Sequence, residues 1–428
     1  MKVIRYPHRV NWPEIIARPP ADTSSVEAAV RAIIDDVKQN GDEALRRLTE
    51  QFDCARIDEM CVSEKEIADA ESRIPDDLKA AINIAKENIE KFHASQLEET
   101  RTVETTPGVV CWRRWVAIEK VGLYVPAGTA PLFSTVLMLA VPASLAGCRE
   151  IVLCSPPDKN GQVSDAILYT AGICGVTSVF KFGGAQVIAA LAYGTETVPK
   201  VFKIFGPGNQ FVTCAKQIVS TDVAIDMPAG PSEVAVFADE TSNPAFVAAD
   251  LLSQAEHGPD SQVILVTTSE TVIEETLGEL ERQITRLPRR DVSERALANS
   301  RAIVVIDIAE GIDLLNDYAA EHLILAVDNA DEVANQVINA GSVFIGNYSC
   351  ESAGDYASGT NHTLPTAGFA KAFSGVSLDS FVKKITFQKL TAEGIRNLGP
   401  TVEIMAAAEG LDAHKNAITL RLEDVNGI

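Results

Sequence analysis

Apolar, strand-like segments alternate with segments of helical periodicity over residues 116–346, and this alternation constrains the fold more than any other feature. Its first part contains the runs IEKVGLYV, EIVLC, SVFKF and KVFKIF, each followed by a helical pattern. Its second part contains EVAVFAD, QVILVTT, AIVVID, HLILAV and SVFIG. Strands that alternate with helices at this pace form parallel sheets with helical crossovers. Two successive sets predict two α/β lobes, and they are compatible with an internal duplication.

The segments on either side of this alternation are helical. Residues 26–91 have apolar positions at helical spacing, with a break at Gly41, and we expect them to pack on the second lobe along the chain. Beyond Gly375 the pattern is helical again. That tail is too short to bury a core of its own, so it must dock on another surface.

Charge and cysteine usage narrow the possible partners. The net charge is −22, from 37 basic and 59 acidic residues, which disfavours nucleic acid and anionic membranes as partners. No apolar run reaches membrane-spanning length, and MKVIRYPHRVNWPEI lacks the apolar region of a signal peptide. The eight cysteines form no C-x-x-C pair, which favours reduced thiols. We therefore expect a cytoplasmic protein.

Gln254 and His257 lie three residues apart near the end of a predicted helix, for which Asn243 is a suitable N-cap. Residues at this spacing share one helical face, so the amide oxygen and the imidazole can point to one metal ion. The alternative is a histidine that is merely favoured by the helix dipole near the helix C-terminus.

Glu321 and His322 directly precede or open the strand HLILAV, at its amino end. Ligands of open α/β sheets bind at the carboxyl edge, so topology gives this pair no support, and an exposed loop pair is the alternative. Asp355 lies in the polar segment ESAGDYASGTNHTLP, which we interpret as an ordered loop that also holds Glu351 and His362. Its alternative role is turn formation.

His414 falls in the first turn of the last predicted helix, behind Asp412 as N-cap and five residues after Glu409. The helix dipole disfavours a protonated imidazole there, and a neutral one can bind a metal. Together with the donors above it gives an all-N/O set that accommodates Zn, Mn or Co. The turns FGPGNQF and FGGAQVIAA favour a nucleotide only weakly, because neither is a dinucleotide fingerprint.

These segments together resemble the histidinol dehydrogenases over about three quarters of the chain, from VGLYVPAGTAPLFSTVLMLAVPA to DAHKNAITLR. The specific strings are KIFGPGN, AIDMPAGPSE, DLLSQAEHGPDSQVIL, EHLI, SAGDYASGTNH and AAAEGLDAHKNA. The resemblance implies oxidation of L-histidinol to L-histidine through L-histidinaldehyde, with two NAD+ in succession. It also implies one zinc per site and a homodimer in which the C-terminal tail reaches the partner's site.

The resemblance assigns roles to residues of this chain. The implied zinc ligands are Gln254, His257, Asp355 and His414. The implied catalytic pair is Glu321 and His322. The implied substrate contacts are Ser232, Gln254, His257, His322, Asp355, Glu409 and His414. The implied NAD contacts are Tyr124, Gln186 and Asn209.

The corresponding fold is α/β, with two incomplete Rossmann-like parallel-sheet lobes and small terminal extensions. We expect an N-terminal extension over 1–20 and a larger, discontinuous lobe of 21–120 with 233–376. The second lobe is expected over 121–232, and a helical tail over 377–428 is expected to dock on the partner subunit.

In the mechanism that follows, a neutral His322, with an ordinary pKa of about 6.5, accepts the alcohol proton. Glu321 activates water to form the aldehyde hydrate, in preference to a thiohemiacetal on Cys148 or Cys154. One alternative is a related zinc- and NAD-dependent dehydrogenase of another small polyol, although Glu409 suits an imidazole N–H. The others are a zinc hydrolase that uses Glu321 as base, and a two-lobed solute-binding protein.

Overall fold

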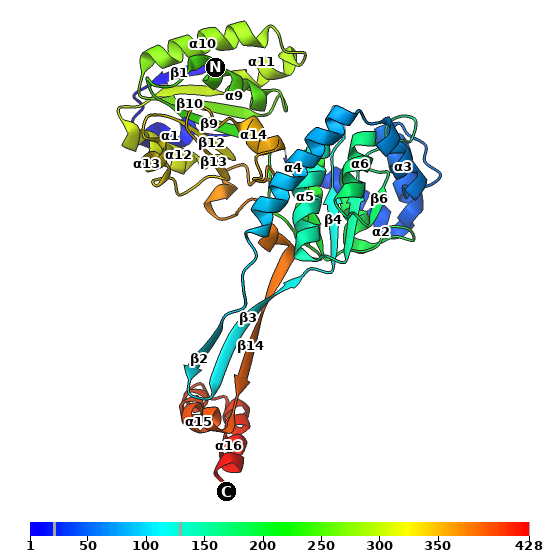
Figure 1. The fold of residues 1–428 in the computed structure, drawn as a ribbon, viewed down its shortest axis with the longest axis vertical. Coiled ribbons are helices and arrows are strands. Elements are labelled where there is room, and N and C mark those ends of the chain that lie inside the picture. Colours follow the sequence, from blue (N-terminus) through cyan, green and yellow to red (C-terminus); the bar gives the residue numbers. More distant parts are fainter. Residues whose placement is uncertain (20–22, 128–130, 428) are drawn as a thin grey trace.

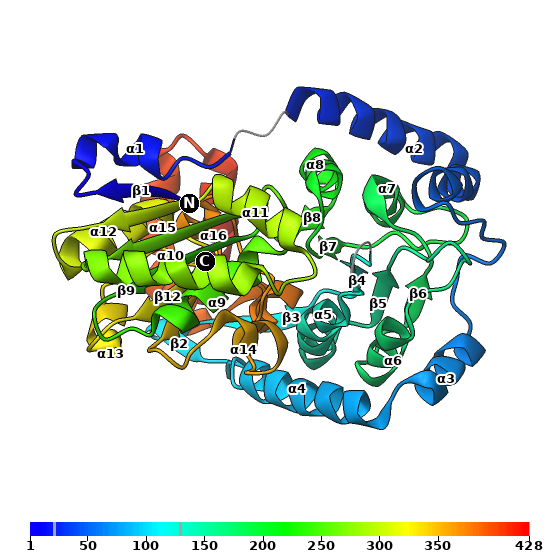
Figure 2. The ribbon, with the colours of Figure 1, turned by 90° about the horizontal axis from the view of Figure 1, so that it is seen from above.

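The computed structural model describes residues 1–19, 23–127 and 131–427. Two α/β lobes lie beside each other, and a slender arm with the C-terminus at its tip projects away from both (Figure 1). Seen from above, each lobe has helices on both faces of its sheet (Figure 2). The α/β class and the two parallel-sheet lobes predicted from the sequence are therefore confirmed.

The first lobe, here called the six-stranded lobe, is built on a parallel sheet. Its strands are, in spatial order, β1 (Lys2–Arg5), β11 (Arg301–Val304), β10 (Gln262–Thr267), β9 (Glu233–Ala238), β12 (His322–Ala326) and β13 (Ser342–Ile345). Its α-helices are α1 (Trp12–Ile15), α9 (Pro244–Ala255), α10 (Glu270–Ile284), α11 (Arg290–Ala298), α12 (Ile308–Tyr318), α13 (Ala330–Ala334) and α14 (Glu351–Tyr356). Short 3-10 turns lie at Arg9–Asn11 and Phe369–Lys371.

The second lobe, here called the five-stranded lobe, has a smaller parallel sheet. Its strands are, in spatial order, β6 (Ser178–Phe180), β5 (Glu150–Cys154), β4 (Lys120–Tyr124), β7 (Lys203–Phe205) and β8 (Ala224–Ile225). Its helices are α2 (Thr23–Asp53), α3 (Glu64–Arg73), α4 (Asp76–Ala94), α5 (Phe133–Ala146), α6 (Asp165–Ile173), α7 (Gly184–Tyr193) and α8 (Gln210–Val219).

Both sheets are wound in the same order. From the central strand β9 the chain adds β10 and β11 on one side and then returns to add β12 and β13 on the other. From β4 it adds β5 and β6 and then returns to add β7 and β8. This is the Rossmann strand order without its sixth strand. The prediction of incomplete Rossmann-like lobes thus holds in both halves.

The N-terminal helices lie where the sequence analysis did not expect them. Residues 21–120 were assigned to the lobe that contains 233–376, but α2 packs on α7 and α8, and α3 and α4 pack on α6 and α5. Apolar residues of α2 such as Val30 and Ile34 join the core of the five-stranded lobe. The periodicity identified helices with an apolar face, but it could not identify the sheet that this face covers. The predicted break at Gly41 is confirmed as a kink.

The terminal segments also differ from their expected form. The expected extension over 1–20 contains β1, an edge strand of the six-stranded sheet, and its boundary at residue 20 lies outside the described residues. The expected helical tail begins with a 3-10 turn (Leu378–Phe381) and the strand β14 (Val382–Leu390). β14 pairs antiparallel with β3 (Val109–Ala117), which also pairs with β2 (Thr102–Thr106). This hairpin and β14 form the shaft of the arm, and α15 (Ala392–Ala408) and α16 (Asp412–Asn426) form its tip.

No helix within the described residues is long and apolar enough to cross a membrane. All eight cysteines fall within the described residues and are free thiols.

Candidate active site at the amino edge of the six-stranded sheet

His322 is the first residue of β12, and it pairs in register with Val234 near the start of β9. Glu321 and His322 are both buried, at the amino edge of the sheet. Ser232 directly precedes β9 and is half-buried at the same edge. The predicted location of the pair is therefore confirmed, but the alternative of an exposed loop pair is wrong. These candidate residues gather at the amino edge although the carboxyl edge is the usual place for ligands.

Helix α9 brings Gln254 to this edge. The Asn243 side chain caps the helix by accepting from the Ala245 N–H at 3.0 Å, and Pro244 occupies the first turn. Gln254 lies in the last turn and is buried, whereas His257 follows the helix and is exposed at the mouth of the site. The helix therefore begins where the sequence predicts, but it ends at Ala255, so His257 is not on the helix face that the sequence analysis assigned to it.

A hydrogen-bond network fixes the Gln254 amide. Its Nε2 donates to the Glu233 carbonyl and to Oε2 of Glu321, both at 3.2 Å. The Glu233 N–H donates to the same Glu321 oxygen at 2.9 Å. Nδ1 of His322 lies 3.3 Å from the Glu233 carbonyl and 3.4 Å from Nε2 of Gln254. In the tautomer with the proton on Nδ1, the ring donates to the carbonyl and Nε2 is its basic position. Oε1 of Gln254 and Nε2 of His322 are buried without a hydrogen-bond partner among the described residues.

Asp355, which lies in α14, is the next side chain that joins Gln254, Glu321 and His322 at this edge. We expected it in a loop, but residues 351–356 form a short helix that packs against α9. Oδ1 of Asp355 lies 3.3 Å from Nε2 of His322, an ion-pair distance at which the two atoms nevertheless make no hydrogen bond. Glu351, one turn earlier, is also buried, and ligand atoms of His257, Glu351 and Asp355 lie within 4.8 Å of one another. The sequence analysis noted Glu351 but gave it no role. Its spacing of four residues from Asp355, on one helical face, was the available signal.

His362 connects this group to the five-stranded lobe. Its Nδ1 lies 2.9 Å from the Asp355 carbonyl, to which it can donate, and its Nε2 lies 3.2 Å from the Thr135 hydroxyl at the start of α5. Asn361 donates to the Met138 carbonyl of the same helix at 2.6 Å. The two lobes therefore meet beside the gathered donors. No sequence signal assigned these contacts.

Burial and mutual charge set the protonation of these groups. Burial raises the pKa of Glu321 to about 8, against the opposing effect of His322. Burial would lower the pKa of His322, but the Glu321, Glu351 and Asp355 carboxyl groups raise it to about 10. Burial also raises the pKa of Glu351 well above its usual range. The sequence analysis used the ordinary histidine pKa because it could not place these carboxyl groups around the ring.

Glu409 and His414 do not join the group within one chain. Both are exposed, at the end of α15 and the start of α16. These helices pack on each other, and α15 also packs on β2 and β14, at the far end of the molecule from α9 and β12 (Figure 1). Of the four implied metal ligands, one chain thus brings together Gln254, His257 and Asp355, and leaves His414 apart.

The three implied cofactor residues meet at the carboxyl edge of the five-stranded sheet. Tyr124 ends β4 and receives a hydrogen bond from the Gly184 backbone. Gln186 is fully buried in the first turn of α7, and neither polar atom of its side chain has a partner within the described part of the chain. Asn209 caps α8, accepting from Phe211 N–H at 3.0 Å. This edge lies where the strand order reverses between β4 and β7, the usual place for a ligand.

Comparisons with known proteins agree over the whole chain. The family model described as histidinol dehydrogenase matches residues 16–422. The histidinol dehydrogenase of Bacteroides fragilis strain YCH46 is 60% identical over 426 residues, covering 99% of this chain and all of that protein. The histidinol dehydrogenase of Bacteroides thetaiotaomicron is 60% identical over 423 residues, covering 99% of each chain. A crystal structure of histidinol dehydrogenase from Elizabethkingia anophelis is 54% identical, with a TM-score of 0.97, and covers 100% of this chain and 99% of that one.

Proposed function

The chain belongs to the histidinol dehydrogenase family, and we propose that it oxidises L-histidinol to L-histidine through L-histidinaldehyde, with two NAD+ as successive hydride acceptors. The observation that carries the proposal is the cluster of unpaired, buried polar atoms around Glu321 and His322. Such atoms are costly unless a ligand pairs with them. We also propose a cytoplasmic location, which is supported by the eight free thiols.

The donor set fits a zinc ion. Oε1 of Gln254 and Oδ1 of Asp355 are buried and have no hydrogen-bond partner in the described ranges. The His257 imidazole, at the mouth, adds a nitrogen donor. An N/O set that leaves coordination positions open is typical of catalytic rather than structural zinc. When bound, the metal would orient the substrate's amine and imidazole nitrogens.

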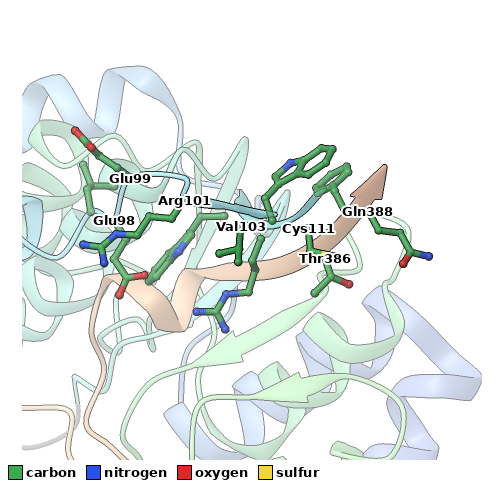
Figure 3. Close-up of a pocket in the computed structure, with 12 residues that line it drawn as sticks. Glu98, Glu99, Arg101, Val103, Cys111, Thr386 and Gln388 are labelled. Atoms are coloured by element: carbon green, nitrogen blue, oxygen red, sulfur yellow. The ribbon is translucent and has the colours of Figure 1, made fainter. Parts of the chain in front are cut away.

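We propose that His414 of a second copy completes this set in a homodimer. The arm carries exposed apolar residues at its tip, including Ile404, Met405 and Leu420. A hollow beside its three-stranded sheet is lined by apolar residues such as Val103, Trp112 and Phe387 and by charged residues such as Glu98, Arg101 and Arg113 (Figure 3). Exposed apolar surface of this kind marks an interface. An arm that crosses to a second copy would bring both Glu409 and His414 to the donor set of that copy. Glu409 would there accept a hydrogen bond from the substrate's imidazole N–H.

Subunit mixing tests the shared site. H322N removes a proposed catalytic side chain from the six-stranded lobe of a subunit, and H414A removes a proposed metal ligand from its C-terminal helix α16. In a mixed dimer one site would carry both defects and the other neither, so each mixed dimer should have half of the wild-type activity. Random exchange of equal amounts makes half of the dimers mixed, so the mixture of two inactive proteins should recover about a quarter. If mixed dimers form and remain inactive, the tail serves its own subunit and the proposal of a shared site is wrong.

His322 is the proposed proton acceptor in both steps. Its Nδ1 is held by the Glu233 carbonyl, which leaves Nε2 to take the proton of the substrate hydroxyl. Glu321, Glu351 and Asp355 raise the pKa of this ring, so engagement of Asp355 as a ligand would remove one of the three causes and lower that pKa. NAD+, when bound, accepts the hydride at each step. Tyr124, Gln186 and Asn209 would hold the NAD+ beside the seam, the contact between the two lobes that His362 and Asn361 make with α5.

Glu321 is the proposed base for the second step, in which water adds to the aldehyde to form a hydrate. Oε2 of Glu321 lies 3.7 Å from Nδ1 of His322, so the proposed water-activating carboxyl group is adjacent to the ring whose Nε2 is the proposed proton acceptor. His322 again accepts a proton as the hydrate loses hydride. The competing thiol route is not supported, because Cys148 and Cys154 are buried, and burial raises the pKa of Cys148 to about 12 and that of Cys154 further.

The direct experiment is to incubate the protein with L-histidinol, excess NAD+ and zinc, and to count NADH per histidinol consumed. We expect two NADH and L-histidine as the product. One NADH would mean that oxidation stops at the aldehyde. A lack of NADH with histidinol, but turnover of another small polyol, would replace the proposed substrate.

A further inference from the structure

Gly206 opens the turn of residues 206–209, between β7 and α8, that carries the proposed cofactor residue Asn209. Its φ of +129° is a conformation that side chains rarely adopt. A Cβ atom there would lie 2.1 Å from the carbonyl oxygen of Tyr124 at the end of β4. The backbone of this turn is therefore in direct contact with the backbone of a second proposed cofactor residue.

A buried ion pair holds Gly206 by both of its backbone groups. The Gly206 N–H donates to Oδ2 of Asp226 at 2.8 Å, and the Lys216 ammonium donates to the Gly206 carbonyl at 2.9 Å. Lys216 and Asp226 also pair with each other, and their side chains are only 5% and 1% exposed. Asp226 is itself fixed by the Met227 N–H at 2.8 Å. The turn is thus attached to α8 through Lys216 and to the segment after β8 through Asp226.

Stability alone does not explain a charged pair at this place. Desolvating two ions costs several kcal/mol, which their attraction only repays when the geometry is good. Hydrogen bonds to charged groups are, however, stronger than neutral ones, at about 1.5–3 kcal/mol each. Two such bonds to a single residue restrict the position of a turn that glycine would otherwise leave flexible.

We infer that Lys216 and Asp226 are positioning residues for the dinucleotide: they fix Gly206 so that Tyr124 and Asn209 stay in place to bind NAD. The inference rests on the proposed function, because it takes this edge as the NAD site. Neither residue contacts the cofactor in this assignment. Their loss should therefore weaken NAD binding while leaving the metal and substrate residues of the other lobe unchanged.

The test compares K216M and D226N with the wild-type protein, using direct NAD titration, zinc titration and the KM for histidinol. We expect the Kd for NAD to rise about tenfold in each variant, about 1.4 kcal/mol. The zinc affinity and the KM for histidinol should change less than twofold. The double variant K216Q/D226N keeps an amide donor and an amide acceptor without the charges, and it should recover part of the NAD affinity. It also supplies folded protein if a single, unpaired buried charge prevents folding.

The matched control is K120M/E150Q, which removes the ion pair between Lys120 and Glu150 at the opposite edge of the same sheet. It should leave the Kd for NAD unchanged. An unchanged NAD affinity in the folded Lys216 and Asp226 variants, or an equal rise in the control, would overturn the inference while the proposed function stands. A wild-type protein that binds no NAD would refute both.

Discussion

The two lobes share one strand order but carry their candidate sites at opposite edges of their sheets. In the five-stranded lobe, Tyr124 and the turn at Gly206 lie at the carboxyl edge, where the strand order reverses. In the six-stranded lobe, Glu321 and His322 lie at the amino edge of the equivalent pair of strands. The same topology therefore does not determine which edge is used.

The carboxyl edge of the six-stranded sheet is closed by its own hydrogen bonds. Asp239 follows β9 and accepts from the Asp328 N–H beyond β12 at 2.7 Å, while its own N–H donates to the Ala326 carbonyl at 3.3 Å. It also accepts from the Thr241 N–H at 2.9 Å. The first two bonds join the ends of β9 and β12, where a ligand would enter, and the third lies within the turn after β9. The amino edge instead receives the C-terminal end of α9 and the helix α14, which bring acidic and amide side chains together.

The largest expected effect is the removal of metal, which should abolish turnover because Gln254 Oε1 and Asp355 Oδ1 would lose their partner. Metal removal should change only the proposed site in the six-stranded lobe and leave NAD binding by the five-stranded lobe intact. Dialysis against a chelator, followed by turnover assays and NAD titration, should give an inactive protein that still binds NAD. Added zinc should restore activity. Full activity in a metal-free preparation would remove the metal from the proposed function.

H322N comes next, with a loss of kcat on the order of 10³-fold, within the range for a general base. Both half-reactions should be impaired, because the same Nε2 accepts the proton in each. Rates measured separately with histidinol and with histidinaldehyde provide the test. The Kd for NAD should stay at the wild-type value, and a large change in it would mean that the two edges are not separate.

E321Q should slow aldehyde oxidation by on the order of 10²-fold and alcohol oxidation much less, because water is activated only in the second step. Single-turnover assays of the two half-reactions distinguish these effects. Glutamine keeps the size of the side chain and can still accept from the Glu233 N–H. Equal losses in both half-reactions would contradict the assignment of Glu321.

Q186L tests the five-stranded lobe. Leucine removes an amide whose two polar atoms lack partners among the residues that the structure describes, so the free protein should be as stable as the wild type or more so. NAD should bind about tenfold more weakly, about 1.4 kcal/mol. T276V is the matched control, because Thr276 is likewise buried and unpaired, but lies in the six-stranded lobe. It should leave NAD affinity unchanged.

T135V should have the smallest effect, because it removes one hydrogen bond across the seam, to Nε2 of His362. A neutral bond contributes about 1 kcal/mol, so kcat should fall several-fold while the affinities for NAD and zinc remain. T170V removes a hydroxyl bond within α6 of the same lobe, and should leave kcat unchanged. Equal effects of the two variants would mean that the seam contact has no special role in catalysis.

Much of the architecture could be predicted because it depends on local pattern. Strand and helix periodicity located both sheets, and Asn243 and Gly41 marked a helix start and a kink that the structure confirms. The strands of the arm were missed. β3 is half-buried or exposed over most of its length and β14 is largely exposed, so neither has the continuous apolar run of a buried strand. The prediction of the lobe on which α2 packs was wrong for a related reason, since an apolar helix face does not identify the surface that it packs against.

By itself, the sequence determined the two parallel-sheet lobes and a set of candidate residues for metal binding and proton transfer, because burial periodicity and side-chain chemistry are local properties. Only the tertiary structure decided that Glu351 joins His257 and Asp355, and that three carboxyl groups surround His322 and raise its pKa. It also separated His414 from the other donors by the length of the arm. These outcomes depend on how distant elements pack, and that packing is set by the whole chain rather than by any one segment of it.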